Sequence, residues 1–244
     1  MRRIAICSAK GGTGKTTTAV SLAHGLALAG NRVLLVDCDP RRDAALHWGL
    51  APEGGLAAWL RGQPARAIEV RAGLHVLDSG GDALTALDRP GDAAVEVQLQ
   101  RALAALQSVD FVLVDCPAGS SALVRAALRS CDEVLIPASA DYLGLAATLA
   151  LLERLATAPA ASPRPRRILG ILPTFYDEAS QSAAALAGFL ASSHARKTLQ
   201  TRIAFSDALR TAPERRGTIF ESDPLSRAAL DYASLTEEVL AAAP

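Results

Sequence analysis

The feature that most constrains the fold is the segment at residues 7–20, CSAKGGTGKTTTAV, in which a glycine-rich loop joins an apolar strand-like run to a helical pattern. Gly11, Gly12 and Gly14 let the backbone approach an anion without a clashing Cβ atom. A loop that leads into a helix N-terminus also directs several backbone N–H groups at one point, which stabilises phosphate oxygens. The segment therefore predicts a phosphate-binding strand–loop–helix unit.

The loop contains two lysines, although the chain has only three lysines among its 25 basic residues. Lys15, in the run GKTT, stands where a nucleotide-binding loop needs a cation for the β- and γ-phosphates, and the Thr16 hydroxyl can coordinate Mg²⁺. The usual pattern G-x-x-x-x-G-K-[ST] is not met, because Ala9 occupies the place of its first glycine. Lys10 has no part in that pattern, so it needs a separate explanation. The predicted nucleotide-binding residues of the loop are Lys10, Gly11, Gly12, Thr13, Gly14, Lys15, Thr16 and Thr17.

Short apolar runs alternate with helical patterns along the chain. Strands are expected at 3–9, 32–37, 74–79, 111–117, 133–139 and 167–176. Helices are expected at 15–30, 93–108, 120–131, 142–157, 179–192, 205–212 and 224–242. Continuous apolar strands separated by helices predict a doubly wound, mostly parallel α/β sheet with helices on both faces. With the phosphate-binding loop after the first strand, the expected fold class is that of the P-loop NTPases. Residues 51–92, apart from the strand at 74–79, are the least readable part of the sequence. The segment 158–167 is the best linker candidate, but a surface loop explains it equally well, and we expect one domain over 1–244.

Composition narrows the class of protein. The 25 basic and 25 acidic residues give a formal charge of zero, so the whole chain is not strongly attracted to nucleic acid. The sequence contains no apolar run of 18 residues, and its N-terminus lacks the long apolar stretch of a signal peptide. We therefore expect a cytoplasmic protein. The four cysteines lack the short paired spacing of zinc sites, and the three that end apolar strand-like runs are expected to be buried. The four cysteines are Cys7, Cys38, Cys116 and Cys131.

Aspartates end two of the expected strands. VLLVDCDP places Asp37 and Asp39 after one apolar run, and FVLVDCP places Asp115 after another. The carboxyl ends of parallel strands share the edge of the sheet at which such folds bind ligands. Carboxylates there can hold Mg²⁺ or its water shell against phosphates, although an aspartate can also simply end a strand. The predicted metal-binding set is Thr16, Asp37, Asp39 and Asp115.

These motifs together resemble a known family. KGGTGKTT is similar to the deviant Walker A motif of the ParA/MinD ATPases, RVLLVDCDP to the second motif of that family, and FVLVDCP to its Walker B motif. The segments at 136–155, 170–177 and 212–224 resemble later blocks of the partition-type Soj branch. The similarity covers nearly the whole chain.

The resemblance implies a set of roles. The chain is expected to hydrolyse ATP with Mg²⁺ and to alternate between an ATP-bound dimer and an ADP-bound or empty monomer. Lys10 would reach across the dimer to the partner's phosphates, as an arginine finger does. Asp39 would lie near the attacking water, and Asp115 would begin the second switch region. Pro173 and Asp177 would lie near the adenine. The predicted catalytic residues are Lys10, Lys15 and Asp39.

The partition-type branch further implies that the ATP dimer binds DNA non-specifically and that a ParB-like or other adaptor stimulates hydrolysis. The cargo would be a chromosome, a plasmid or another cellular assembly, and DNA binding would place the protein on the nucleoid. Residues 161–227 contain ten basic against six acidic residues, which is a local excess suited to phosphate contacts. One departure weakens the match, because Arg41-Arg42-Asp43 follows Pro40 where partition proteins typically carry Gln-Gly-Asn.

Two alternative functions use the same scaffold. A MinD-like membrane switch needs a basic amphipathic C-terminal helix, but the tail has one arginine against Asp231, Glu237 and Glu238, so no membrane anchor is expected. A metabolic enzyme, such as an ATP-dependent ligase or amidase or an iron–sulfur reductase, needs a substrate pocket or suitably spaced cysteines. The sequence shows no such pocket and contains no C-x-x-C motif.

Overall fold

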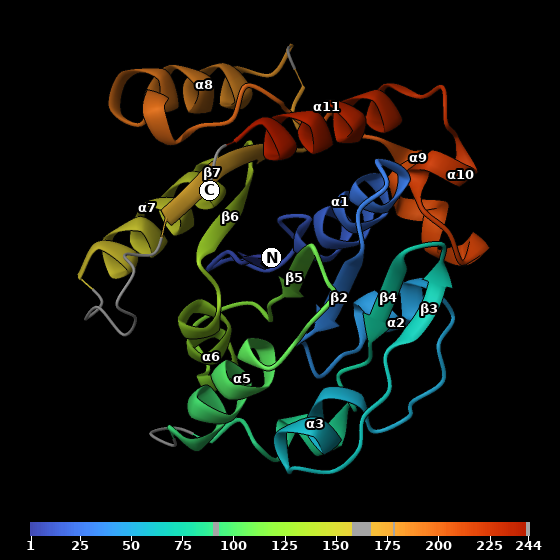
Figure 1. Ribbon diagram of the computed structural model, residues 1–244. Coiled ribbons are helices and arrows are strands. Elements are labelled where there is room, and N and C mark those ends of the chain that lie inside the picture. The colour runs from blue at the N-terminus through green and yellow to red at the C-terminus, as the bar shows by residue number, and fades with distance from the viewer. Residues whose placement is uncertain (90–92, 158–166, 178, 243–244) are drawn as a thin grey trace.

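One seven-stranded sheet runs through the computed structural model, which describes residues 1–89, 93–157, 167–177 and 179–242. The strands lie in the order β3-β4-β2-β5-β1-β6-β7, and every neighbouring pair is parallel except β3 with β4 (Figure 1). The strands are β1 (Arg2–Ile6), β2 (Val33–Asp37), β3 (Ile68–Arg71), β4 (Leu74–Leu77), β5 (Phe111–Asp115), β6 (Glu133–Ser139) and β7 (Arg167–Thr174).

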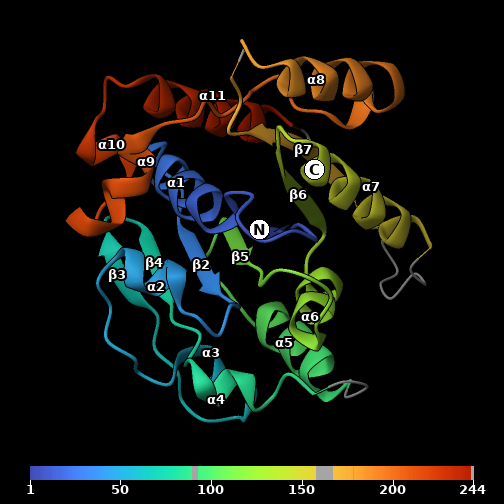
Figure 2. The same ribbon diagram turned by 180° about the vertical axis from the view of Figure 1, so that it is seen from behind.

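Helices cover both faces of the sheet (Figures 1 and 2). One face carries α1 (Lys15–Leu28), α2 (Asp43–His47), α9 (Asp207–Thr211), α10 (Ile219–Ser222) and α11 (Arg227–Ala241). The other carries α3 (Gly55–Leu60), α4 (Asp82–Thr85), α5 (Ala94–Ala104), α6 (Ala122–Ser130), α7 (Tyr142–Thr157) and α8 (Gln181–Ser193). Two short 3₁₀ helices, η1 (Ala195–Lys197) and η2 (Ala212–Arg215), complete the assignment.

The central strands β2 and β5 are apolar up to their final aspartates because both of their faces are covered. All five residues of β2 are buried; Val33 and Leu35 pack with the α1 layer, whereas Leu34 and Val36 pack with the α5–α6 layer. Strand residues alternate between the two faces, so a continuous apolar run supplies both cores. Full burial of one such side chain contributes roughly 1.5–3 kcal/mol. The doubly wound α/β fold predicted from the sequence is confirmed.

Each expected strand overlaps an observed one, and the differences lie elsewhere. Residues 51–92, in which only the strand at 74–79 was predicted, also contain α3, α4 and the edge strand β3, which pairs antiparallel with β4. The helix expected at 205–212 is α9 followed by η2, and the one expected at 224–242 is α11 from residue 227, with α10 before it. All four cysteines are buried. Most of the linker candidate 158–167 lies outside the described residues, but residue 167 begins β7.

Within the described part of the chain, no helix has both the length and the apolar character needed to span a bilayer.

Candidate functional site

The loop between β1 and α1 is held in an open curve by backbone conformation and by three hydroxyl groups. Gly12 (φ 72°) and Gly14 (φ 82°) adopt left-handed conformations that favour glycine. The Ser8 and Thr13 hydroxyls lie 2.6 Å apart, and Ser8 Oγ donates to the Lys10 carbonyl at 2.9 Å. Thr174, at the end of β7, donates to the Thr13 carbonyl at 2.9 Å. The loop is thus fixed both from within and from a neighbouring strand.

Lys15 is enclosed by this loop. It is the first residue of α1 and is only 5% exposed. Its Nζ donates to Ser8 Oγ at 3.3 Å and to the Lys10 carbonyl at 3.2 Å. Burial lowers the pKa of Lys15, and the charges of Asp115 and Asp39 oppose that shift. A cation that is buried beside a helix N-terminus and glycine-loop amides suits a phosphate group.

Lys10 lies in a different environment, half-buried at the mouth of the loop. Its Nζ contacts both carboxylate oxygens of Asp141 at 2.9 Å and Ser139 Oγ at 3.4 Å. Burial would raise the pKa of Asp141, but hydrogen bonds from Lys10, Ser139 and the Gly144 amide lower it to about 2. Asp141 was not identified from the sequence. It follows an expected strand by two residues, and this position near a strand end is the signal that could have found it.

Asp37 and Asp115 lie opposite each other at the ends of the neighbouring strands β2 and β5. Asp115 is fully buried, and neither of its carboxylate oxygens has a partner of good hydrogen-bond geometry. Burial raises the pKa of Asp115 to about 7, against the opposing effects of the Thr16 hydroxyl and Lys15. Asp37 accepts from the Asp39 amide at 3.1 Å and the Ala45 amide at 3.0 Å, and burial raises its pKa well above its usual range. Asp37 therefore positions the loop that follows β2.

The environment of Asp115 fits the predicted magnesium ion. A buried carboxylate without a hydrogen-bond donor, close to the Thr16 hydroxyl, can accept from the water shell of a hydrated cation. The described residues contain no group of three or more His, Cys, Asp or Glu side chains arranged to hold a metal by themselves. Mg²⁺ at phosphate sites typically keeps several waters and binds one or two protein oxygens plus phosphates, so this arrangement is sufficient for it.

Asp39 is held by the chain that follows it. Its carboxylate accepts from the Arg41 amide at 3.0 Å, from Arg41 Nε at 3.3 Å to each oxygen, and from Arg41 Nη2 at 3.0 Å. The same guanidinium contacts Asp43 at 3.2 Å. The sequence identified Arg41 only as a departure from the family pattern and did not reveal this contact.

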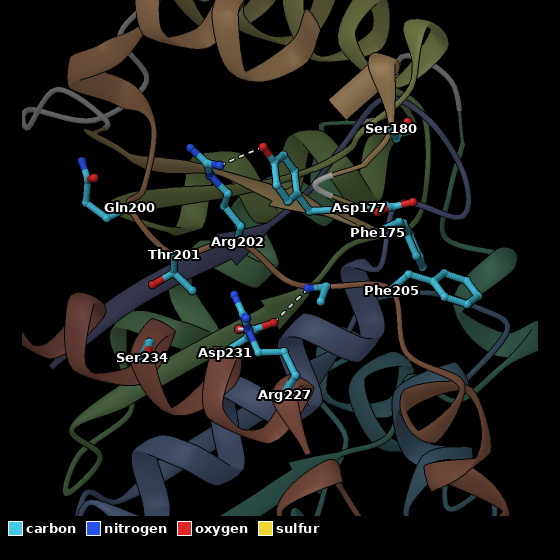
Figure 3. Close-up of a pocket in the computed structure, with 12 residues that line it drawn as sticks. Phe175, Asp177, Ser180, Gln200, Thr201, Arg202, Phe205, Arg227, Asp231 and Ser234 are labelled. Atoms are coloured by element: carbon cyan, nitrogen blue, oxygen red, sulfur yellow. Dashed lines mark hydrogen bonds and ion pairs between the residues drawn. The ribbon is translucent and has the colours of Figure 1, made fainter. Parts of the chain in front are cut away.

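Two cavities share the lining residues Phe175 and Phe205, and the smaller one borders the loop. A cavity of about 220 Å³ adjoins the start of α1 and is lined by Gly14, Thr17, Phe175 and Phe205 among others. A larger cavity, of about 990 Å³, shares Phe175 and Phe205 and also contains Arg202, which contacts the Tyr176 hydroxyl (Figure 3).

The residues expected near the adenine do not line the smaller cavity, which is the one that adjoins the phosphate loop. Asp177 lines the larger cavity, and Pro173 is buried and lines a third pocket near η1. Their predicted contact with adenine stays a prediction.

The comparison with protein families agrees with this geometry. Residues 4–219 match the model of the CobQ/CobB/MinD/ParA nucleotide binding domain. The chain belongs to this family. Among curated members, the chromosome-partitioning ATPase Soj of Thermus thermophilus is 36% identical over 242 residues, which cover 99% of this chain and 96% of that protein. The resemblance to the ParA/MinD family, and to its Soj branch, is therefore confirmed.

Solved structures of ParA/MinD-like proteins share the fold. A variant of McdA from Cyanothece in complex with ATP has a TM-score of 0.84 at 22% identity, and the match covers 100% of this chain and 98% of that one. MinD from Pyrococcus horikoshii with Mg-ADP has a TM-score of 0.82 at 24% identity, with 98% and 95% covered. At this level of identity the likeness establishes the fold of this family member, and the roles of single residues stay predictions.

Proposed function

We propose that the chain is a Mg²⁺-dependent ATPase that dimerises around ATP. The observation that carries this proposal is the contrast between the two lysines of one loop. Lys15 is enclosed by its own loop, whereas the side chain of Lys10 is 32% exposed and bound to one partly exposed carboxylate, Asp141. A cation placed in this way can leave its partner and reach a phosphate group on a second subunit.

Each residue of the site then has a defined task. When bound, Mg²⁺ neutralises charge that develops on the phosphate oxygens. The Thr16 hydroxyl would hold the ion and Asp115 its water shell, while Lys15 binds the β- and γ-phosphates. Asp39 would orient the attacking water. Asp37 is predicted to be a metal ligand too, but its two backbone hydrogen bonds support a role in holding the Asp39 loop.

The small cavity beside Gly14 supports a place for the base. It is mostly apolar and lies at the start of α1, where a nucleotide with its phosphates in the loop would direct its base. Phe175 and Phe205 offer aromatic faces for stacking. We propose this cavity as the adenine site. Pro173 precedes Thr174, which lines it, and Asp177 lines the larger cavity that shares Phe175 with it.

The biological role that we propose is spatial organisation. The ATP dimer would bind DNA non-specifically, and an adaptor would stimulate hydrolysis and release. The similarity to the chromosome-partitioning ATPase Soj supports a role in partitioning. The contacts of the basic residues limit this proposal, because Arg167, Arg210 and Arg227 pair with carboxylates. Arg164 and Arg166 lie outside the described residues. The remaining candidates for DNA phosphates are Arg196, Lys197, Arg202, Arg215 and Arg216.

The alternative of a membrane-binding C-terminal helix has little support in the packing of α11. Its apolar residues Tyr232, Leu235 and Val239 are buried in the core together with those of α1. A helix that uses its apolar face in this way does not offer that face to a bilayer.

The proposed function is tested with Mg-ATP, Mg-ADP and no nucleotide, first by sedimentation and then by binding to non-specific duplex DNA across a salt series. We expect a dimer only with ATP, and DNA affinity that requires ATP and falls steeply with salt. The Lys10→Ala variant should still bind ATP but stay monomeric. Dimerisation of Lys10→Ala would contradict the role proposed for Lys10. DNA affinity that is the same with ATP, with ADP and without nucleotide would contradict the proposed ATP-dependent DNA binding.

A further inference from the structure

The guanidinium of Arg41 is bound to the carboxylate of Asp39, the group that would orient the attacking water in the proposed reaction. Its Nε lies 3.3 Å from each oxygen of Asp39, its Nη2 lies 3.0 Å from Oδ2, and its own amide donates to Oδ1 at 3.0 Å. Both oxygens of Asp39 therefore already accept hydrogen bonds from one residue of the same subunit. A carboxylate that orients a nucleophilic water must accept a hydrogen bond from that water.

The two side chains differ in their freedom to move. The side chain of Asp39 is 5% exposed, whereas that of Arg41 is 66% exposed and extends over Asp39 toward Asp43. The arginine can swing into solvent without opening the core, and the carboxylate cannot. Any change that frees Asp39 is thus a movement of Arg41.

The backbone on either side is fixed, which makes the Arg41 side chain the movable part of the loop. Arg42 Nε contacts Asp78 at 2.6 Å, and Arg42 Nη2 donates to the Leu50 carbonyl at 3.0 Å. On the other side, Asp37 holds the amides of Asp39 and Ala45. Hydrogen bonds thus hold the loop between β2 and α2 on both sides of Arg41, whereas the guanidinium of Arg41 lies on its surface.

We propose that Arg41 is a positioning residue that restrains Asp39, and that hydrolysis requires Arg41 to release this carboxylate. The inference rests on the proposed ATPase function and deepens it. It means that the contact between Arg41 and Asp39 within one subunit slows the hydrolysis of ATP. A second chain or an adaptor that offers Arg41 another anion would release Asp39. The departure of Arg41 from the family's glutamine is consistent with a chain-specific restraint.

The first test compares steady-state hydrolysis of Mg-ATP by the wild-type protein and by Arg41→Gln, which removes the charge and leaves a shorter, uncharged polar side chain. We expect kcat to rise about three- to tenfold and KM to stay within about twofold, since a partly exposed ion pair is a modest restraint. Arg41→Lys keeps the charge but loses the planar two-nitrogen contact, so its kcat should lie between the two. Arg101→Gln, on the exposed face of α5, is the matched control and should behave as wild type.

The second test needs no hydrolysis and uses the nucleotide-free protein. Hydrogen exchange of the amides at 39–43 should be faster in Arg41→Gln than in wild type and intermediate in Arg41→Lys, with α1 and β5 unchanged. Faster exchange with unaltered kcat would overturn the proposal, as would unaltered exchange. A lower kcat with weaker ATP binding would also overturn it and make Arg41 a phosphate-binding cation.

The two tests separate the inference from the function on which it rests. A wild-type protein that binds ATP but shows no turnover, alone or as a dimer, contradicts the proposed ATPase while the exchange experiment still measures the restraint. If Arg41→Gln does not fold, Arg41→Lys is compared with wild type instead. The proposal then requires a smaller rise in kcat together with a smaller increase in amide exchange at 39–43.

Discussion

In the proposed cycle, the ion pair between Lys10 and Asp141 opens before Lys10 contacts a second subunit. The contact is partly exposed, so opening it costs roughly 0.5–1 kcal/mol. Asp141→Asn should therefore strengthen ATP-dependent dimerisation about two- to fivefold, as measured by sedimentation in Mg-ATP. Asp132→Asn removes a comparable carboxylate, bound to Arg3 at 2.9 Å, and should leave dimerisation unchanged. Weaker dimerisation of Asp141→Asn would show that Asp141 supports the dimer.

Asp115 makes the stability of the nucleotide-free protein depend on pH. Its pKa in the folded state is about 7, whereas an unfolded aspartate titrates near 4. Between these values the folded state binds the extra proton, so the free energy of unfolding falls as pH rises and levels off above about pH 7. The asparagine of Asp115→Asn does not titrate, so this variant should be more stable than wild type by roughly 4 kcal/mol at pH 8 and by only roughly 1 kcal/mol at pH 4.5. Urea unfolding at both pH values measures the difference, and an advantage that does not grow with pH would contradict it.

At the scale of elements, the loop from β2 to α2 places an arginine where a glycine would fit better. Arg42 has φ 64°, a left-handed conformation that costs a non-glycine residue roughly 1–2 kcal/mol. Its contacts with Asp78 and the Leu50 carbonyl offset that cost. Arg42→Gly and Arg42→Ala both lose the contacts, but only the alanine keeps the strain.

We therefore expect Arg42→Gly to be more stable than Arg42→Ala by about 1 kcal/mol in thermal or urea unfolding. Equal stabilities would mean that the loop relaxes once the arginine is gone.

The elements also show which parts of the fold could be predicted from the sequence. VLLVD and FVLVD are buried on both faces, so their apolar runs are unbroken and easy to recognise. β3, with the sequence IEVR, has four residues, none fully buried, and it pairs antiparallel at the edge of the sheet, so no continuous apolar run marks it. The phosphate loop was recognisable because its glycines, lysines and threonines are adjacent in the sequence.

The side-chain contacts of Lys10 and Arg41 were not predictable in the same way. Lys10 and Asp141 are separated by 131 positions, and only the β1–β6 pairing brings their strands together. The contact between Arg41 and Asp39 is local, but it depends on a side-chain conformation that residue types alone do not specify.

At the scale of the whole molecule, ATP binding, dimerisation and stability should be linked. If ATP promotes dimerisation, a tenfold increase in protein concentration adds about 0.7 kcal/mol per chain to the stability of the ATP-bound form. For a chain of 244 residues this raises the midpoint of thermal unfolding by about 2 °C. The shift should be present with Mg²⁺ and a non-hydrolysable ATP analogue, and absent with Mg-ADP and in Lys10→Ala. A concentration-dependent midpoint with Mg-ADP would contradict the ADP-bound monomer, and one in Lys10→Ala would mean that the dimer forms without the lysine.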